Sequence, residues 1–512
     1  MGAQSHGAPS EAGVYRRPLG QDPATLDPAR ISDVYSRSVA QQIFDGLVQF
    51  DSTLTIIPAL AHFWKASRDG LTWTFTLRPG VKFHHGREVT ADDVVFSFTR
   101  ILDPRLKSSA AEIFATIKGA LEFRDGRAET VSGLVAVDAS TVRITLTESF
   151  TPFVSVLAMG HAKIVPRDLV ERAPDTFGLA PVGTGPFKFS QWERGKSITL
   201  LRNADYFDGP PHLARLVFRV FGGGNVPAMY EEFTQGRLED TPVPTARYGG
   251  MDPRGEYQYI KRPMFNLRHY GFNTRVKPFD DRRVRRAITA AIDRAAILED
   301  IYGGRFVAAR GILPPGTLGF NPAVKPIAYD PEAARALLKE AGYPGGRGLP
   351  SLPFWSGAKT ERTVAEHERI KKSLDAIGIR VDFQYETDWP TFTRRLAEGR
   401  TGAYLYAWFA DIPDPDNFLH LLFHSRSPRN YMGYANRVVD DLLARARKEP
   451  DLQRRVDLYR RAEQLILDDA PMMGFWHSPY DRLFQRYVRS IEVNGLGDPY
   501  IPLRKIRLEP AR

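Results

Sequence analysis

Alternating apolar and polar residues predict several short β-strands. Leu71, Trp73, Phe75 and Leu77 are separated by threonines, and the turn Pro79-Gly80 follows them. A period of two is typical of a half-buried strand, because successive side chains point to opposite faces of a sheet. The same period occurs at 142–146 and at 379–385, and a strand-like run covers 404–409.

Residues at helical spacing lie between these strands. Thr90 and Asp93 form the capping box of a helix that continues to residue 101. Asp330 and Pro331 fit the N-cap and first position of another helix, which ends near 341–342. Apolar periodicity predicts a further helical segment from 284 that ends near 303–304, and one over 452–465. Strands that alternate with helices over this length predict an α/β fold.

Length and composition indicate a large globular protein. The chain has 512 residues, of which 43% are hydrophobic and 25% are charged. A single hydrophobic core stops growing at roughly 250–300 residues, so we expect at least two lobes. The 38 prolines and 42 glycines are spread along the whole chain, which favours many short connections over one long linker.

The formal net charge of +10 raises the question of an anionic partner. Basic residues occur as scattered pairs such as Arg16-Arg17, Arg282-Arg283 and Arg454-Arg455, usually with acids nearby. The sequence contains no block of five or six like charges and no basic strip interleaved with aromatic residues. We therefore predict an arginine-rich solvated surface and no nucleic-acid partner.

The absence of cysteine excludes disulfides, thiolate zinc sites, iron–sulfur clusters and cysteine nucleophiles. Residues 1–13 are small and polar and lack the apolar core of a signal peptide, so we predict a disordered tail there. No stretch approaches the roughly 18 apolar residues of a membrane-spanning helix. If the protein is exported, we expect its leader to have been removed or to lie upstream of Met1.

Enzyme and metal-site motifs fail on their spacing. Gly195-Lys196-Ser197 resembles the end of a phosphate-binding loop, but Ser190 stands where that motif requires glycine. His367-Glu368 is not followed by a second histidine at the zinc-protease spacing, and the adjacent His84-His85 pair would point apart in an extended segment. The nucleophile elbow G-x-S-x-G is absent. The sequence therefore predicts no enzyme, no metal site and no cofactor.

An acidic loop follows the strand-like run at 404–409. Asp411, Asp414 and Asp416 are interspersed with Pro413 and Pro415, which make the segment stiff and non-helical. Paired carboxylates can act as a general acid and base, but no nucleophile or set of metal ligands lies nearby in the sequence. We expect one carboxylate to meet a cation, and Asp416 to be the N-cap of the following helix.

The order of ten short segments resembles one family of proteins. These segments are Thr25–Pro28, Ile43–Val48, Asp69–Phe75, Leu77–Gly86, Thr90–Val94, Gly183–Phe187, Asn273-Thr274, Pro278–Ala287, Leu337–Tyr343 and Trp408–Phe418. In this order they resemble the dipeptide/oligopeptide/opine/nickel-type substrate-binding proteins of ABC importers, bacterial solute-binding protein family 5. The resemblance covers roughly residues 20 to 500.

The resemblance implies a two-lobed periplasmic-binding-protein-like clamp with an additional small α/β domain and a ligand cleft between the lobes. Lobe I would contain 14–40, 161–264 and 480–512, the additional domain 41–160, and lobe II 265–479. A ligand that contacts both lobes would shift such a clamp from open to closed. The closed form would then be recognised by the membrane permease of the importer.

The resemblance also implies ligand-contacting residues in lobe II. Asp411 would receive the ammonium group of a peptide, or alternatively only stabilise its proline-rich loop. Trp408 would wall the pocket beside Phe409, or alternatively belong to the core. A ligand carboxylate would meet Arg362, with Lys359 as the second choice, and both are alternatively solvated residues at a helix start.

Further contacts are implied elsewhere in the chain. Ser32, Asp33, Val34 and Tyr35 would form an extended segment beside the ligand, with the acid at Asp33 one step from its place in peptide binders. Tyr270 would touch the ligand from the hinge. Gly183 and Gly185 are more simply explained as structural residues of a tight turn.

These expectations define one leading function and several alternatives. The protein would be a monomeric, extracytoplasmic subunit of an ABC importer, periplasmic or membrane-tethered, that binds a short peptide or a related zwitterion. Within the same fold, the ligand is alternatively an opine, a sugar or a metal chelate. Presentation of the ligand to a chemoreceptor fits the same clamp, and a peptide or ester hydrolase is the alternative of a different class.

Overall fold

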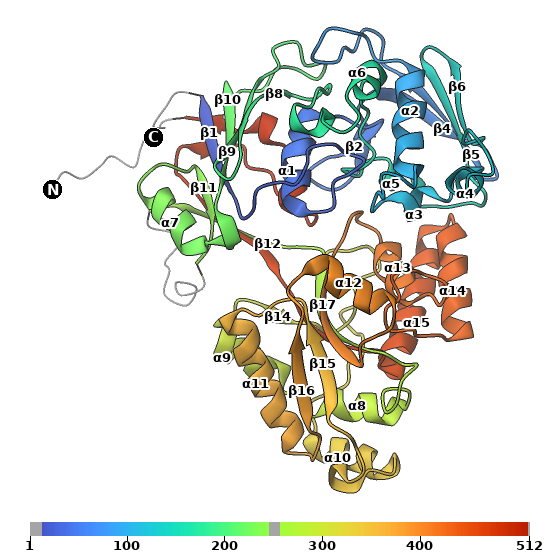
Figure 1. The fold of residues 1–512 in the computed structure, drawn as a ribbon, viewed down its shortest axis with the longest axis vertical. Coiled ribbons are helices and arrows are strands. Elements are labelled where there is room, and N and C mark those ends of the chain that lie inside the picture. Colours follow the sequence, from blue (N-terminus) through green and yellow to red (C-terminus); the bar gives the residue numbers. More distant parts are fainter. Residues whose placement is uncertain (1–12, 245–255, 510–512) are drawn as a thin grey trace, which may run out of the picture. The chain divides into compact units, whose positions relative to one another are not determined.

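The computed structural model describes residues 13–244 and 256–509. The chain divides into two compact units: unit 1 contains residues 1–262 and 480–512, and unit 2 contains residues 263–479 (Figure 1). The chain passes from one unit to the other within two strands, β12 (Gln258–Pro263) and β19 (Pro479–Phe484). The predicted tail, residues 1–13, lies outside the described residues except for Gly13.

The predicted α/β class is confirmed, because each unit combines β-sheets with helices. Unit 2 begins and ends within two residues of the predicted lobe II, 265–479. The predicted lobe I and the additional domain 41–160 both lie in unit 1. Their separation from each other stays a prediction.

The described residues of unit 1 form two four-stranded sheets and three smaller ones. The four-stranded sheets have the orders β1-β10-β9-β8 and β4-β5-β7-β6. Their strands are β1 (Val14–Leu19), β4 (Ala61–Ala66), β5 (Thr72–Leu77), β6 (Leu134–Asp138), β7 (Thr141–Thr145), β8 (Phe187–Glu193), β9 (Ser197–Arg202) and β10 (Arg215–Val220). The smaller sheets combine β11 (Asp240–Pro242) with β19 and β12, β2 (Val48–Phe50) with β3 (Ile56–Pro58), and β20 (Val488–Arg489) with β21 (Arg507–Leu508).

The α-helices of unit 1 connect and cover these sheets (Figure 1). They are α1 (Val34–Ile43), α2 (Ala91–Leu102), α3 (Ala111–Phe114), α4 (Ala120–Arg124), α5 (Phe153–Val156), α6 (Arg167–Arg172) and α7 (Val226–Thr234). Gly183 and Gly185 have the structural role that the sequence predicts. A Cβ atom on Gly183 would lie 2.1 Å from the carbonyl oxygen of Ile43, at the end of α1, so the turn has no room for a side chain there.

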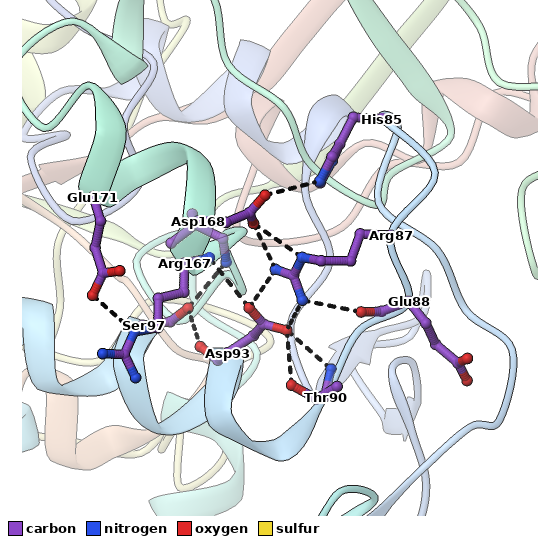
Figure 2. A network of polar contacts seen from close by, with 10 residues as sticks. His85, Arg87, Glu88, Thr90, Asp93, Ser97, Arg167, Asp168 and Glu171 are labelled. Carbon is purple, nitrogen blue, oxygen red and sulfur yellow. Dashed lines mark hydrogen bonds and ion pairs between the residues drawn. The ribbon is translucent and has the colours of Figure 1, made fainter.

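A polar network around Asp93 joins helices α2 and α6 (Figure 2). The Asp93 carboxylate accepts a hydrogen bond from the Thr90 amide at 3.0 Å and so caps its own helix. It also accepts from the Arg167 amide at 3.2 Å, at the first residue of α6, which has no capping side chain of its own. Arg87 donates two further hydrogen bonds to Asp93, at 2.6 and 2.9 Å. The Asp93 side chain is 2% exposed, so its charge depends on these donors.

Unit 2 is built on one six-stranded mixed sheet in the order β14-β18-β13-β17-β15-β16. Its strands are β13 (Asn266–Phe272), β14 (Val307–Ala308), β15 (Leu352–Ser356), β16 (Val381–Tyr385), β17 (Ala403–Phe409) and β18 (Met472–His477). Its α-helices are α8 (Arg282–Ala290), α9 (Arg294–Tyr302), α10 (Pro331–Glu340), α11 (Glu361–Asp375), α12 (Trp389–Ala397), α13 (Leu419–Phe423), α14 (Arg437–Lys448) and α15 (Leu452–Asp469). Apolar residues of α8, α9 and α11 pack with the sheet in one core.

Most predicted elements are confirmed, with ends shifted by at most four residues. The predicted strands correspond to β5, β7, β16 and β17, and three predicted helices correspond to α2, α10 and α15. The prediction of one helical segment from 284 to 303 is wrong, because the chain breaks there into α8 and α9. Asp293 leaves helical geometry to cap α9, and its carboxylate accepts from the Ala296 amide at 3.0 Å.

The network in Figure 2 yields a test with a control variant one residue away. We expect Asp93→Ala to lower the free energy of unfolding by about 2–4 kcal/mol, since it removes a helix cap and leaves buried donors unpaired. Asp92 lies on the same first turn of α2 but is exposed, so Asp92→Ala should change stability by less than about 0.5 kcal/mol. Urea unfolding followed by circular dichroism measures both values. Equal losses in the two variants would contradict the role of the network.

Candidate functional site

Strand pairing in unit 2 brings several predicted site residues to one edge of the sheet. β17 runs antiparallel to β13 and parallel to β15, and β15 runs parallel to β16. The carboxyl ends of β15, β16 and β17 therefore share an edge with the amino end of β13, where Asn266 pairs with Phe409. In open α/β sheets, ligands bind outside the carboxyl ends of the strands. We call this end of the unit 2 sheet, where the carboxyl ends of β15, β16 and β17 meet the amino end of β13, the candidate edge.

The loop after β17 is held by one buried amide side chain. The Asn417 Oδ1 atom accepts from the backbone amide of Asp411 at 2.9 Å and from the indole Nε1 of Trp408 at 3.2 Å. Asn417 is buried, whereas Asp411 and Trp408 are half-buried and Phe409 is 53% exposed. The loop thus holds the backbone of Asp411 in place at the end of the central strand.

Asp414 anchors the same loop to helix α15. Its carboxylate accepts two hydrogen bonds from the Arg455 guanidinium, at 2.7 and 2.9 Å, and both side chains are almost fully buried. Burial raises the pKa of Asp414, and the charge of Arg455 opposes that rise. The predicted meeting of a loop carboxylate with a cation is confirmed in this pair.

The prediction that Asp416 caps the following helix is wrong. Asp414 is the N-cap of the short 3-10 turn Pro415–Asn417, and its Oδ1 accepts from the Asp416 amide at 2.9 Å. The buried Asp416 carboxylate instead accepts from the Tyr459 hydroxyl at 3.1 Å and pairs with Arg447 at 3.2 Å. The prolines start the turn earlier than the sequence pattern indicates.

A group of three aromatic side chains, Trp389, Tyr406 and Tyr431, lies on one face of the sheet near the end of β17. Trp389 is 51% exposed, and its ring stacks on Tyr406 at a centroid distance of 5.8 Å. Tyr406 in turn contacts Tyr431 edge-on, also at 5.8 Å. Burial raises the pKa of Tyr406, and the charges of Tyr431 and Asp411 raise it further. The Asp411 carboxylate therefore lies close enough to Tyr406 for its negative charge to contribute to the raised pKa of that hydroxyl.

The two predicted carboxylate-binding residues stand on different sides of the α11 start. Thr360 is the N-cap, and its hydroxyl accepts from the Thr363 amide at 3.2 Å. The Lys359 ammonium lies over the Tyr385 ring, 5.2 Å from its centroid. Arg362 is exposed on the first turn, and its charge acts on Tyr302 of α9. The structure therefore turns the two cations toward different neighbours.

The position of Tyr270 does not favour the predicted ligand contact, because its side chain is fully buried in the core of unit 2. Its hydroxyl donates to Glu366 Oε1 at 2.5 Å. The same carboxylate accepts from the Tyr302 hydroxyl at 2.6 Å and from Arg268 at 3.2 Å. Sequence reasoning missed Glu366 and Arg268, because their sequence separation of 98 residues gives no local signal.

The segment from Ser32 to Tyr35 lies in unit 1, and the prediction that it is extended throughout is wrong. Val34 and Tyr35 are the first two residues of α1, and Asp33 is its N-cap. The Asp33 carboxylate accepts from the amide of Ser36 at 2.7 Å and from its hydroxyl at 2.6 Å. Asp33 therefore has a capping role, while Ser32 and Val34 are exposed.

The described residues include no group of three or more histidine, aspartate or glutamate side chains arranged to hold a metal ion. In residues 13–244 and 256–509, no helix is both long enough and apolar enough to cross a membrane. At the candidate edge, Asp411 follows β17, the aromatic rings of Tyr406 and Trp389 lie on one face of the sheet, and Lys359 and Arg362 lie on the α11 side. This combination is typical of a site that binds a small polar molecule.

Comparison with known proteins identifies the class. Residues 55–430 match the family described as "Bacterial extracellular solute-binding proteins, family 5 Middle". The protein belongs to this family, and the resemblance found in the sequence is confirmed.

Individual relatives cover nearly the whole chain. The chain is 31% identical over 476 residues to the dipeptide-binding protein of Escherichia coli strain K12, covering 89% of this chain and 87% of that protein. It is 32% identical over 501 residues to heme-binding protein A of Haemophilus influenzae, covering 93% and 89%. Its fold is similar to that of the ABC transporter-associated periplasmic binding protein DppA from Helicobacter pylori in complex with the peptide STSA. That likeness has a TM-score of 0.83 and 30% identity, and it covers 98% of this chain and 99% of that chain.

The loop after β17 allows a structural acid to be distinguished from a predicted ligand-binding acid. We expect Asp414→Ala to lower the free energy of unfolding by about 3–5 kcal/mol, because it leaves the buried Arg455 without its counter-charge. Asp411→Ala, in the same loop, removes a half-buried carboxylate and should cost less than about 1 kcal/mol. Urea unfolding of both variants measures the difference. A larger loss for Asp411→Ala would show that the loop depends on Asp411 instead.

Proposed function

We propose that this protein captures a short peptide with free amino and carboxyl termini and delivers it to the membrane subunits of an ABC importer. The observation that carries the proposal is the candidate edge, where Asp411 follows β17 and Arg362 follows the neighbouring strand β15. An acid and a guanidinium at the ends of adjacent strands suit the two charged ends of a zwitterion.

The dimensions of the sheet support a small ligand. Neighbouring strands lie about 4.8 Å apart, and an extended chain spans about 3.3–3.6 Å per residue. An extended dipeptide, at about 7 Å, is therefore long enough to span the ends of two adjacent strands. Trp408, Phe409 and Trp389 provide the apolar surface next to Asp411.

The choice between the two cations favours Arg362. The Lys359 ammonium is placed over the Tyr385 ring, so moving it to a ligand would forfeit a cation–π contact of about 0.5–1 kcal/mol. Arg362 is exposed and offers a planar fork that matches a carboxylate. We therefore propose that Arg362 binds the carboxylate of the ligand and that Lys359 stays over the Tyr385 ring.

Relatives support the same function. The Escherichia coli relative is named as a dipeptide-binding protein, and the Helicobacter pylori structure contains a bound peptide. We infer a periplasmic or other extracytoplasmic location and a binding role without catalysis. A metal chelate is the second candidate ligand, because another relative is named heme-binding protein A and the exposed Trp389 and Phe409 would suit a flat apolar molecule.

A thermal-shift experiment with capped peptides tests the proposal. A ligand at a hundredfold excess over its Kd stabilises the folded state by about 2.7 kcal/mol. We expect Ala-Ala to raise the Tm of the wild-type protein, and N-acetyl-Ala-Ala, which lacks the ammonium group, to have little effect.

Variants of unit 2 complete this experiment. Asp411→Ala should lose the response to Ala-Ala, whereas Asp382→Ala, which removes an exposed acid near the amino end of β16, should keep it. An equal response to the acetylated peptide would overturn the assignment of Asp411. A response to hemin and to no peptide would replace the peptide with a metal chelate.

A further inference from the structure

Arg268 lies on β13 next to the candidate edge and projects toward helices α9 and α11. Its guanidinium carbon lies 5.2 Å from the centre of the Trp476 ring on the neighbouring strand β18. The Phe306 ring stacks on the Trp476 ring, and the two ring centres are 4.1 Å apart. The Arg268 side chain is 16% exposed, so it reaches the surface of unit 2 while its base is packed.

Glu366 holds Arg268 in this position. Its carboxylate is fully buried and accepts from Arg268 Nη2 at 3.2 and 3.4 Å. The hydroxyls of Tyr270 and Tyr302 donate to the same two oxygens. Burial lowers the pKa of Arg268, but the charges of Glu366, Tyr302 and Tyr270 and the hydrogen bond to Glu366 together outweigh this effect and raise it. Three donors thus satisfy Glu366, and Arg268 stays charged.

Arg362 stands one helical turn before Glu366 on α11. Residues four apart on a helix have Cβ atoms about 5–6 Å from each other on the same face. The charge of Arg362 acts on Tyr302, which is itself bonded to Glu366. Arg268 and Arg362 therefore flank one carboxylate that already has three hydrogen-bond donors.

Arg268 has hydrogen-bonding capacity that Glu366 does not use. A guanidinium carries five N–H donors, and both hydrogen bonds to Glu366 come from Nη2. Among the described residues, the Nε–H of Arg268 has no acceptor. The Nε–H is buried, but among the described residues no hydrogen bond uses Nη1, so this end of the part-exposed guanidinium is available to a ligand.

We propose that Arg268 and Arg362 form a two-arginine subsite for the carboxyl end of the ligand, which selects peptides whose last residue is acidic. Such a residue carries an α-carboxylate and a side-chain carboxylate a few bonds apart. Arg362, on the exposed first turn of α11, binds the α-carboxylate, and Arg268 binds the second carboxylate. This inference rests on the proposed function and adds a ligand class to it.

Binding of two matched dipeptides to the wild-type protein tests the inference. Ala-Glu and Ala-Gln have nearly the same shape, and they differ in one negative charge. We expect calorimetric titration to give a Kd for Ala-Glu about tenfold lower than for Ala-Gln, since a charge-assisted hydrogen bond is roughly twice as strong as a neutral one. This comparison needs no variant, so it does not depend on how a mutant folds.

Three variants assign the preference to residues. Arg268→Met should weaken Ala-Glu more than Ala-Gln and so bring the two Kd values together, and Arg268→Lys should keep part of the preference. Arg362→Met should weaken both peptides, because both carry the α-carboxylate. Arg380→Met is the control. It removes an exposed arginine just before the amino end of β16, at the end of the strands that lies away from the candidate edge.

The outcomes separate this inference from the proposed function. If neither dipeptide binds and no other peptide does, the proposed function fails and the subsite fails with it. Equal Kd values for Ala-Glu and Ala-Gln in the wild-type protein would overturn the subsite and leave peptide binding intact. A loss of both peptides to the same degree in Arg268→Met, with a lowered Tm, would show that Arg268 is only a structural brace.

Discussion

The pairing of β17 with its two neighbours is the constraint on which the candidate site depends. An antiparallel partner on one side and a parallel partner on the other bring the start of β13 and the ends of β15 and β17 to the same edge. Residues 49 to 143 positions apart in the sequence are thereby collected at one end of the sheet. Asp411, Arg362 and Arg268 come to this edge through strand pairing and not through any local motif.

Buried carboxylates then fix the side chains around that edge. Asp414 joins the loop after β17 to α15 through Arg455, and Glu366 joins β13 and α9 to α11. Removing charges from water is costly, so such groups persist only where several donors satisfy them. Asp93 acts in the same way in unit 1, where it caps two helices at once. In each case a charge stabilises geometry that a hydrophobic contact would specify less strictly.

The sequence predicted the features that short-range physics controls. Strand alternation, the capping box at Thr90 and the proline at the start of α10 gave elements whose ends were nearly correct. The errors arose where two local choices compete. Asp414 and Asp416 are both suitable caps, and the position of the turn between the prolines decides for Asp414. At Asp293, a capping residue inside an apolar helical pattern ended one helix and began the next.

Prediction of the candidate site from the sequence went only as far as the resemblance to relatives. That resemblance named Asp411 and Arg362, but it gave no information on the buried groups behind them. The burial of Tyr270 and its bond to Glu366 depend on how α11 packs on the sheet. Arg268 was missed for the same reason. A single arginine in a strand gives no signal until its partner Glu366, 98 residues later in the sequence, is known.

We propose that the candidate edge receives the two charged ends of a peptide. A crystal structure of the protein with bound Ala-Ala tests it most directly. We predict an ammonium nitrogen within about 3.2 Å of an Asp411 carboxylate oxygen and a terminal carboxylate at a similar distance from the Arg362 guanidinium. A peptide whose termini contact other side chains, or that binds away from this edge, would contradict the account.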